Sequence, residues 1–303
     1  MTGLVVVGVD GSPASDAALS WALEVAACRG ADLEALYVWR WDVPAPVPMA
    51  PDVPSQLARA AGSAADGQLA RVMARRPVGA PPVEARASAA EGSPGPALVH
   101  AATTADLLVL GRHGQSDVSR RLVGQLLGSV AAHCLTSSPA PVVVVPPDAG
   151  VQPPGRVVVG VDGSDGSSRA LRWAADHARA VGSRVVAVLT WQLTTLPAPS
   201  SATPGAVPAL PEWNARAEHV LDTICRAALG DGGRDVERVV LHQAAVIGLL
   251  GAVQPGDLLV VGDRGRGGFA RLLLGSVSRQ CAEHAPCPVV VVPPRDRLAG
   301  AGA

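Results

Sequence analysis

The sequence predicts an α/β fold built from two tandem, doubly wound domains, each with a five-stranded parallel sheet in the order 3-2-1-4-5. One observation is an internal repeat: residues 5–12 (VVVGVDGS) recur unchanged at residues 157–164. The other is that short, continuous apolar runs alternate with segments of helical periodicity in each half. Such runs are typical of parallel strands with helices on both faces of the sheet.

The repeat continues along the chain. The same offset of 152 residues pairs Trp21 with Trp173 and Trp39 with Trp191. Near the ends of the units, residues 141–147 (PVVVVPP) recur at 288–294, with an offset of 147. We therefore predict one domain over residues 1–147 and a second over 155–295, joined by a Pro- and Gly-containing seam.

The apolar runs predict strands at residues 4–9, 33–39, 83–89, 106–110 and 141–145, and at 156–161, 184–190, 236–242, 257–261 and 288–292. In the first unit we expect helices at 14–28, 56–76, 95–103 and 118–136. The last strand of each unit would lie at a sheet edge, and exposed apolar edge strands tend to pair. We therefore expect the two units to join edge to edge as an internal pseudo-dimer.

Composition limits the functional classes. A formal net charge of −1 gives no electrostatic case for nucleic acid or for an anionic membrane surface as a partner. No apolar run approaches the length of about 18 residues that a membrane-spanning helix needs. Five scattered cysteines and the lack of a secretory leader favour reduced thiols in a cytoplasmic protein.

A glycine-rich turn follows the fourth strand of each unit, at residues 111–129 and 262–276. Turns of this kind, from a strand into a helix, often hold phosphate, because glycine lets backbone N–H groups approach an anion. The candidate phosphate-facing residues are Gly262, Gly265, Gly275 and Ser276, with Gly111, Gly114, Gly128 and Ser129 in the first unit.

An aspartate ends the first strand of each unit, Asp10 and Asp162. Ligands of open parallel sheets bind at the carboxyl ends of strands, where the strand order reverses, so these carboxylates could accept hydrogen bonds from a ribose or a base. Alternatively, the Asp-Gly-Ser sequence only turns the chain and caps the next helix. The two roles are compatible.

These motifs, in this order and in two copies, resemble the universal stress protein family over nearly the whole chain. In its ATP-binding branch the loop reads Gly, two residues, Gly, nine residues, Gly, then Ser or Thr, and the second unit matches this spacing. The resemblance implies a pseudo-dimeric adenine-nucleotide-binding protein of stress response or signalling, without efficient catalysis. It implies that the ligand is ATP, with or without Mg²⁺, or AMP or cyclic AMP, and it leaves a further homodimer open.

The resemblance also implies roles for individual residues. Asp162 and Asp10 would contact the nucleoside, and residues near the end of the second strand, Thr190 and Val38, would line the adenine pocket. Residues that follow the Gly-Ser pairs complete the candidate sites: Val277 and Val130.

The two candidate sites differ. Thirteen residues instead of nine separate Gly114 from Gly128, and four extra residues, about one helical turn, predict a shift of Gly128 by about 6 Å. In the second unit Asp263 would repel a phosphate, unless it points to solvent or nearby arginines such as Arg264 and Arg266 offset its charge. We expect unequal sites, with the second unit the stronger binder.

Two other functional classes remain open. One is an interaction or scaffold protein of the same family that has lost nucleotide binding. The other is an enzyme, a slow ATPase or nucleotidyl-transfer relative, against which the lack of a Walker-type lysine and of a legible nucleophile arrangement argues. We expect no metal site, because the best spacing, Cys281-His284-Cys287, lies where core packing or a plain loop is predicted. Two Pro-rich stretches, 42–55 and 193–211, are interpreted either as variable loops or as lids.

Overall fold

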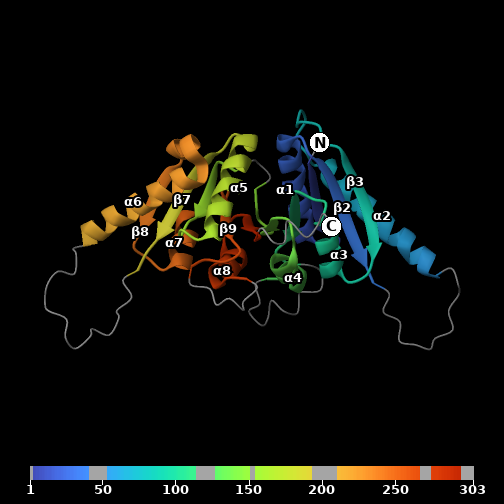
Figure 1. Cartoon of the computed structure of the whole chain (residues 1–303). Coiled ribbons are helices and arrows are strands. Elements are labelled where there is room, and N and C mark those ends of the chain that lie inside the picture. The colour runs from blue at the N-terminus through green and yellow to red at the C-terminus, as the bar shows by residue number, and fades with distance from the viewer. Residues whose placement is uncertain are drawn as a thin grey trace, which may run out of the picture.

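In the computed structural model the chain forms one ten-stranded sheet (Figure 1), described for residues 3–40, 53–113, 127–150, 154–192, 210–266 and 274–294. The strand order is β3-β2-β1-β4-β5-β10-β9-β6-β7-β8. Each half therefore has the predicted 3-2-1-4-5 order, and the halves meet in the middle of the sheet.

The strands agree with the predicted apolar runs to within two residues. In the first half they are β1 Leu4–Val9, β2 Asp32–Trp39, β3 Ala85–Glu91, β4 Leu107–Gly111 and β5 Val142–Val145. In the second half they are β6 Arg156–Gly160, β7 Arg184–Thr190, β8 Glu237–Leu241, β9 Leu258–Gly262 and β10 Val289–Val292.

The two halves are joined through β5 and β10, which pair antiparallel with Val143 opposite Val290. The neighbouring strand pairs within each half are parallel. Both valines are fully buried, because helices cover both faces of the sheet at this junction. The predicted internal pseudo-dimer is thus confirmed.

The helices form one layer on each face of the sheet. One core contains residues of α1 Pro13–Arg29, α2 Val53–Met73, α5 Asp165–Val181 and α6 Leu210–Leu229. The opposite core contains residues of α3 Pro94–Ala101, α4 Ser129–Ser137, α7 Ala245–Ala252 and α8 Ser276–His284, and a 3₁₀ helix, η3 Gly230–Asp235, follows α6. Figure 1 shows α1 and α5 facing each other over the centre of the sheet.

Two sequence-based expectations need correction. The helix expected over residues 118–136 does not extend back to residues 127–128, since α4 begins at Ser129, and residues 118–126 lie outside the described part of the chain. The Pro-rich stretches also end earlier than expected, because α2 begins at Val53 and α6 at Leu210. Residues 42–52 and 193–209, which carry the choice between loop and lid, lie outside the described residues.

No helix in the described ranges combines the length and apolar character needed to cross a membrane.

Candidate functional site

The Asp-Gly-Ser turns at the ends of β1 and β6 cap the following helices. Ser164 Oγ accepts a hydrogen bond from the Ser167 backbone N–H at 3.1 Å, and Asp162 Oδ1 accepts one from the Ser164 N–H at 3.0 Å. The first unit has the same two bonds, from Ser15 to Ser12 Oγ at 3.1 Å and from Ser12 to Asp10 Oδ1 at 3.0 Å. The turn and capping role is therefore confirmed, and it uses one carboxylate oxygen of each aspartate.

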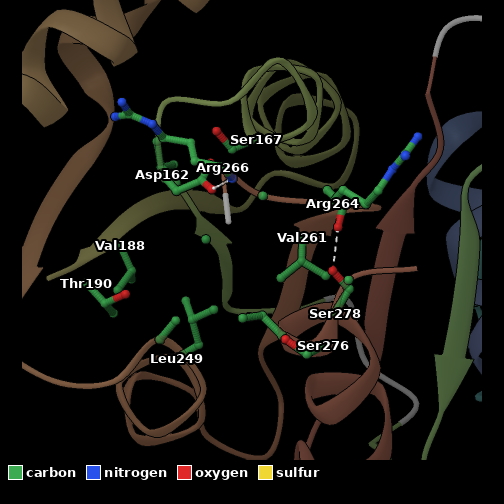
Figure 2. Close-up of a pocket in the computed structure, with 17 residues that line it drawn as sticks. Asp162, Ser167, Val188, Thr190, Leu249, Val261, Arg264, Arg266, Ser276 and Ser278 are labelled. Atoms are coloured by element: carbon green, nitrogen blue, oxygen red, sulfur yellow. Dashed lines mark hydrogen bonds between the residues drawn. The ribbon is translucent and has the colours of Figure 1, made fainter. Parts of the chain in front are cut away.

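The other oxygen of Asp162 reaches the glycine-rich loop (Figure 2). Oδ2 accepts a hydrogen bond from the Arg266 backbone N–H at 2.7 Å. A Cβ atom at Gly265 would lie 2.4 Å from this oxygen, so only glycine at 265 permits the contact. Burial alone would raise the pKa of the Asp162 carboxyl, but hydrogen bonds from Ser164, Arg266 and Ser167 lower it overall.

This pKa shift predicts a pH dependence of stability. Because the pKa of Asp162 is lower in the folded than in the unfolded protein, its stabilising contribution is present above about pH 4 and is lost as the pH falls through the folded-state value. Urea unfolding of wild type and Asp162→Asn should show a stability difference at pH 6 that shrinks in acid. A difference that grows as the pH falls would contradict the assignment.

Asp162 lies at the edge of a cavity of about 560 Å³ at the carboxyl ends of β6 and β9. The cavity brings together all seven residues predicted for the second unit, which are Asp162, Thr190, Gly262, Gly265, Gly275, Ser276 and Val277. They come from four separate segments of the chain, so their convergence follows from the strand order. That they contact a nucleotide stays a prediction.

The cavity has an apolar and a polar side. Val188, Thr190 and Leu249 lie together on one side in Figure 2, and Ser276 and Ser278 lie on the other. Arg264 and Arg266 of the glycine-rich loop also line it. An arrangement of this kind can take a flat apolar ring at one end and an anionic group at the other.

Asp263 lies outside this cavity lining and does not point to solvent. It is 2% exposed, and its carboxylate forms ion pairs with Arg169 of α5 at 3.1 Å and with Arg264 at 3.2 Å. The solvent-facing alternative is therefore wrong. Since the carboxylate is neutralised behind the loop, Asp263 does not present an unpaired negative charge to a bound phosphate.

The glycines of the loop have a packing role that the phosphate interpretation did not foresee. A Cβ atom at Gly262 would lie 2.6 Å from the backbone of Gly166, in the first turn of α5. In the first unit a Cβ atom at Gly111 would lie 2.7 Å from the Ala14 carbonyl oxygen. These glycines let the helix start approach the end of the neighbouring strand, which brings the Asp-Gly-Ser turn beside the loop.

Gly262→Ala should therefore destabilise the protein by about 1–3 kcal/mol, since the backbone that it would meet cannot rotate away. Gly251→Ala is the matched control in the same unit, because its Cβ would meet open space within α7 and alanine favours helix. Denaturant unfolding measures both. Equal effects of the two substitutions would show that the close approach is unimportant.

The first unit has a smaller cavity, of about 250 Å³. It is lined by five of the predicted residues, which are Asp10, Val38, Gly111, Gly128 and Val130. Of the others, Ser129 is the first residue of α4 but is not among the described residues lining the cavity, and Gly114 lies outside the described part of the chain. His113 also lines the cavity.

The four extra residues of the first loop do not displace Gly128. Its N–H donates to the Arg112 carbonyl at 2.8 Å, just as the Gly275 N–H donates to the Asp263 carbonyl at 2.8 Å. Both glycines are the N-caps of their helices, with nearly equal backbone angles. The predicted shift of about 6 Å is therefore wrong, and the extra length falls within residues 114–126.

Sequence reasoning missed several residues of the two sites. Gln68 of α2 is 2% exposed. It accepts a hydrogen bond from the Gly11 N–H at 2.8 Å and donates one to Ser15 Oγ at 2.8 Å, so it links α2 to the Asp-Gly-Ser turn of the first unit. Ser278 Oγ donates to the Gly262 carbonyl at 2.6 Å. A single polar residue within a helical pattern does not show in the sequence which distant backbone group its side chain will bind. Leu249 and its repeat partner Leu98 line the second and the first cavity, respectively. The only signal for them in the sequence is that both units have a leucine at this position.

The second residue of each glycine-rich loop carries opposite charges in the two units. Arg112, the repeat partner of Asp263, donates from Nη2 to the Ala285 carbonyl at the end of α8 and so links the two halves.

Cys281 and Cys287 are fully buried, as the packing interpretation predicted. Within the described ranges, no three metal-binding side chains gather in one place.

The universal stress protein family model matches residues 1–146 and 154–293, which is nearly the whole of both halves. The chain belongs to the universal stress protein family. This universal stress protein is 30% identical over 296 residues to universal stress protein Rv2623 of Mycobacterium tuberculosis, covering 95% of each chain. It is 31% identical over 301 residues to universal stress protein Rv2005c of the same species, covering 95% of this chain and 96% of that one.

A solved universal stress protein from Archaeoglobus fulgidus has the same fold, with a TM-score of 0.63 at 16% identity, covering 96% of this chain and 98% of its own. Universal stress proteins act in the stress response and are in general not enzymes. The family and the tandem arrangement that the sequence motifs predicted are thus confirmed.

Proposed function

We propose that this universal stress protein binds an adenine nucleotide, ATP in the first place, in the cavity at the carboxyl ends of β6 and β9. It would act in stress response or signalling as a nucleotide-dependent binding protein, without efficient catalysis. The observation that carries the proposal is the hydrogen bond from Arg266 N–H to Asp162, because it folds the glycine-rich loop against the carboxyl edge of the sheet. The loop thereby forms one wall of a cavity that has both apolar and polar sides.

The start of α8 supports phosphate binding. Its N-cap is Gly275, which provides no side-chain acceptor, and the helix begins at Ser276. The N–H groups of a first helical turn and the positive end of the helix dipole attract anions. Arg266 of the facing loop adds a positive charge, and Ser276 adds a hydroxyl donor at the start of the helix.

The apolar side supports adenine binding. Val188 and Leu249 provide surfaces for a ring, and Thr190 has a hydroxyl that can meet a ring nitrogen. At about 560 Å³ the second cavity has a volume typical of small-molecule sites, whereas the first, at about 250 Å³, is below that range. We therefore propose one strong site per chain, in the second unit.

Mg²⁺ would accompany ATP rather than occupy a site of its own. Asp162 is the one carboxylate that lines the second cavity in the described part of the chain, and both of its oxygens accept backbone hydrogen bonds. A Mg²⁺ ion would thus be held mainly by phosphates and water. With a single, already engaged carboxylate, these residues favour binding over hydrolysis. We place the protein in the cytoplasm, where thiols such as its five free cysteines stay reduced.

The test is a titration of the purified chain with ATP, AMP and cyclic AMP, followed by calorimetry and by thermal unfolding. We expect a stoichiometry near one and, at a 100-fold excess over Kd, a stabilisation of about 2.7 kcal/mol. A lack of stabilisation at millimolar concentrations of all three would instead favour the interaction or scaffold alternative. Two equal sites per chain would contradict the ranking of the two units.

A further inference from the structure

A third cavity, of about 470 Å³, lies between the two halves of the chain on the face covered by α1 and α5. It is bounded by residues that precede β1 and β5, Gly3 and Pro141, and by Pro293 after β10. None of these residues lines either nucleotide cavity. The cavity is therefore separate from the sites described above.

Three arginines line this cavity, Arg29 from α1 and Arg169 and Arg172 from α5. Arg169 is neutralised by its ion pair with Asp263. Arg172 donates from Nε to the Ala228 carbonyl at 3.2 Å and has no carboxylate within 4 Å among the described residues. Arg29 and Arg172 therefore carry two positive charges without an ion pair to any described residue.

Arg29 is the more unusual of the two. Its guanidinium lies 5.7 Å from the centre of the Trp173 ring of the other half, yet no described residue accepts a hydrogen bond from it. Its Nη1 atom is buried and has no hydrogen-bond partner in the described part of the chain. Burial lowers the pKa of this guanidinium, and the charges of Asp106 and Asp176 act against that effect. A buried, charged donor without an acceptor is costly, so the side chain has capacity for a ligand.

The two carboxylates at the cavity are already engaged. Asp106 Oδ2 accepts from the Leu4 N–H at 3.0 Å, and Asp176 pairs with Arg179 at 2.8 Å. Neither approaches Arg29 or Arg172 within ion-pair distance in the described structure. The two acidic residues therefore reduce the positive charge of the cavity, but they do not accept hydrogen bonds from Arg29 or Arg172.

The internal repeat argues against a purely structural origin of these arginines. Trp173 has a tryptophan as its repeat partner, but Arg169, Arg172 and Arg29 correspond to Ala17, Ser20 and Val181. A lone arginine in the last turn of a helix can be explained by the helix dipole. The dipole does not explain why arginines from both helices gather on one side of the pseudo-twofold axis, when the equivalent positions on the other side hold uncharged residues.

We propose that this interdomain cavity is a binding site for a small oxyanion, a phosphate or carboxylate group held by Arg29 and Arg172. Guanidinium groups bind both kinds of oxyanion through paired N–H donors. Because the two arginines come from different halves, a bound anion would bridge the halves beside the β5–β10 junction.

Calorimetry with inorganic phosphate and with succinate, at constant ionic strength, tests the site and distinguishes the two chemistries. We expect binding of at least one probe by the wild type. Arg29→Gln and Arg172→Gln should each weaken it about tenfold or more, since each removes a charged hydrogen bond. Arg29→Lys, which keeps the charge, should restore part of the affinity.

Two variants serve as controls. Arg226→Gln removes an exposed arginine of α6 outside the cavity and should leave probe binding unchanged. Gly275→Asp blocks the proposed nucleotide site and should also leave it unchanged, so the two proposals can fail independently. If Arg29→Gln fails to fold, Arg172→Gln, whose side chain is exposed, carries the test. The proposal is overturned if neither probe binds at millimolar concentration, if the two Arg→Gln variants bind as the wild type does, or if binding is lost in Gly275→Asp.

Discussion

The Gly275→Asp variant should lose roughly 100-fold or more of the affinity for ATP while keeping its fold. A carboxylate at this position would stand at the wall where we place the phosphates, and two like charges about 4 Å apart repel by several kcal/mol even at an effective dielectric constant of 20. Aspartate is itself a favourable N-cap, so the start of α8 should be retained. The added Cβ would lie 3.2 Å from the Asp263 carbonyl oxygen, which asks for only a small adjustment.

Gly128→Asp is the matched control, because Gly128 is the N-cap of α4 with nearly the same backbone angles. Calorimetric titration with ATP should find its affinity within about twofold of wild type if the second unit carries the strong site. The reverse pattern, with affinity lost in Gly128→Asp and kept in Gly275→Asp, would move the nucleotide site to the first unit. Equal losses in both would mean that the two cavities bind alike.

Most of the fold could be predicted from the sequence, because its signals are local and repeated. Three features each occur twice: the valine runs of β5 and β10, the Asp-Gly-Ser turns and the glycine loops. The assignment of each feature in one unit therefore supports the assignment of its counterpart in the other. The strand order then followed from general rules for open parallel sheets, and it brings the seven predicted second-unit residues into one cavity.

What the sequence could not predict are contacts between residues far apart in the chain. The carboxylate of Asp263 is held by Arg169, 94 positions earlier, and no local pattern tells whether a loop aspartate faces a ligand, the solvent or the core. Gln68 reaches the first Asp-Gly-Ser turn from α2 in the same way. The four extra residues before Gly128 misled the prediction, because added chain length does not have to move the helix that follows it.

The Arg169→Met variant should be destabilised by about 3 kcal/mol. Its partner Asp263 has a side chain only 3% exposed, and removal of one member of a buried ion pair leaves an uncompensated charge in a medium that solvates it poorly. Arg169 also donates from Nε to the Pro293 carbonyl at 3.1 Å, so a second hydrogen bond is lost. Arg264, at 3.2 Å from the same carboxylate, keeps the expected loss at the lower end of the range for buried pairs. Urea unfolding at neutral pH measures the effect.

Arg179→Met is the control on the same helix, because the Arg179–Asp176 pair is exposed, with both side chains more than 70% accessible. Such pairs contribute little, and we expect a change below about 0.5 kcal/mol. The double variant Arg169→Met/Asp263→Leu separates the ion pair from packing, since it removes both charges together. If the pair is important because Asp263 must not remain buried alone, the double variant recovers much of the loss. If the double variant is as unstable as Arg169→Met, the Arg169 guanidinium stabilises the protein through its hydrogen bond to Pro293 and its packing. Neutralisation of the Asp263 charge would then contribute little to stability.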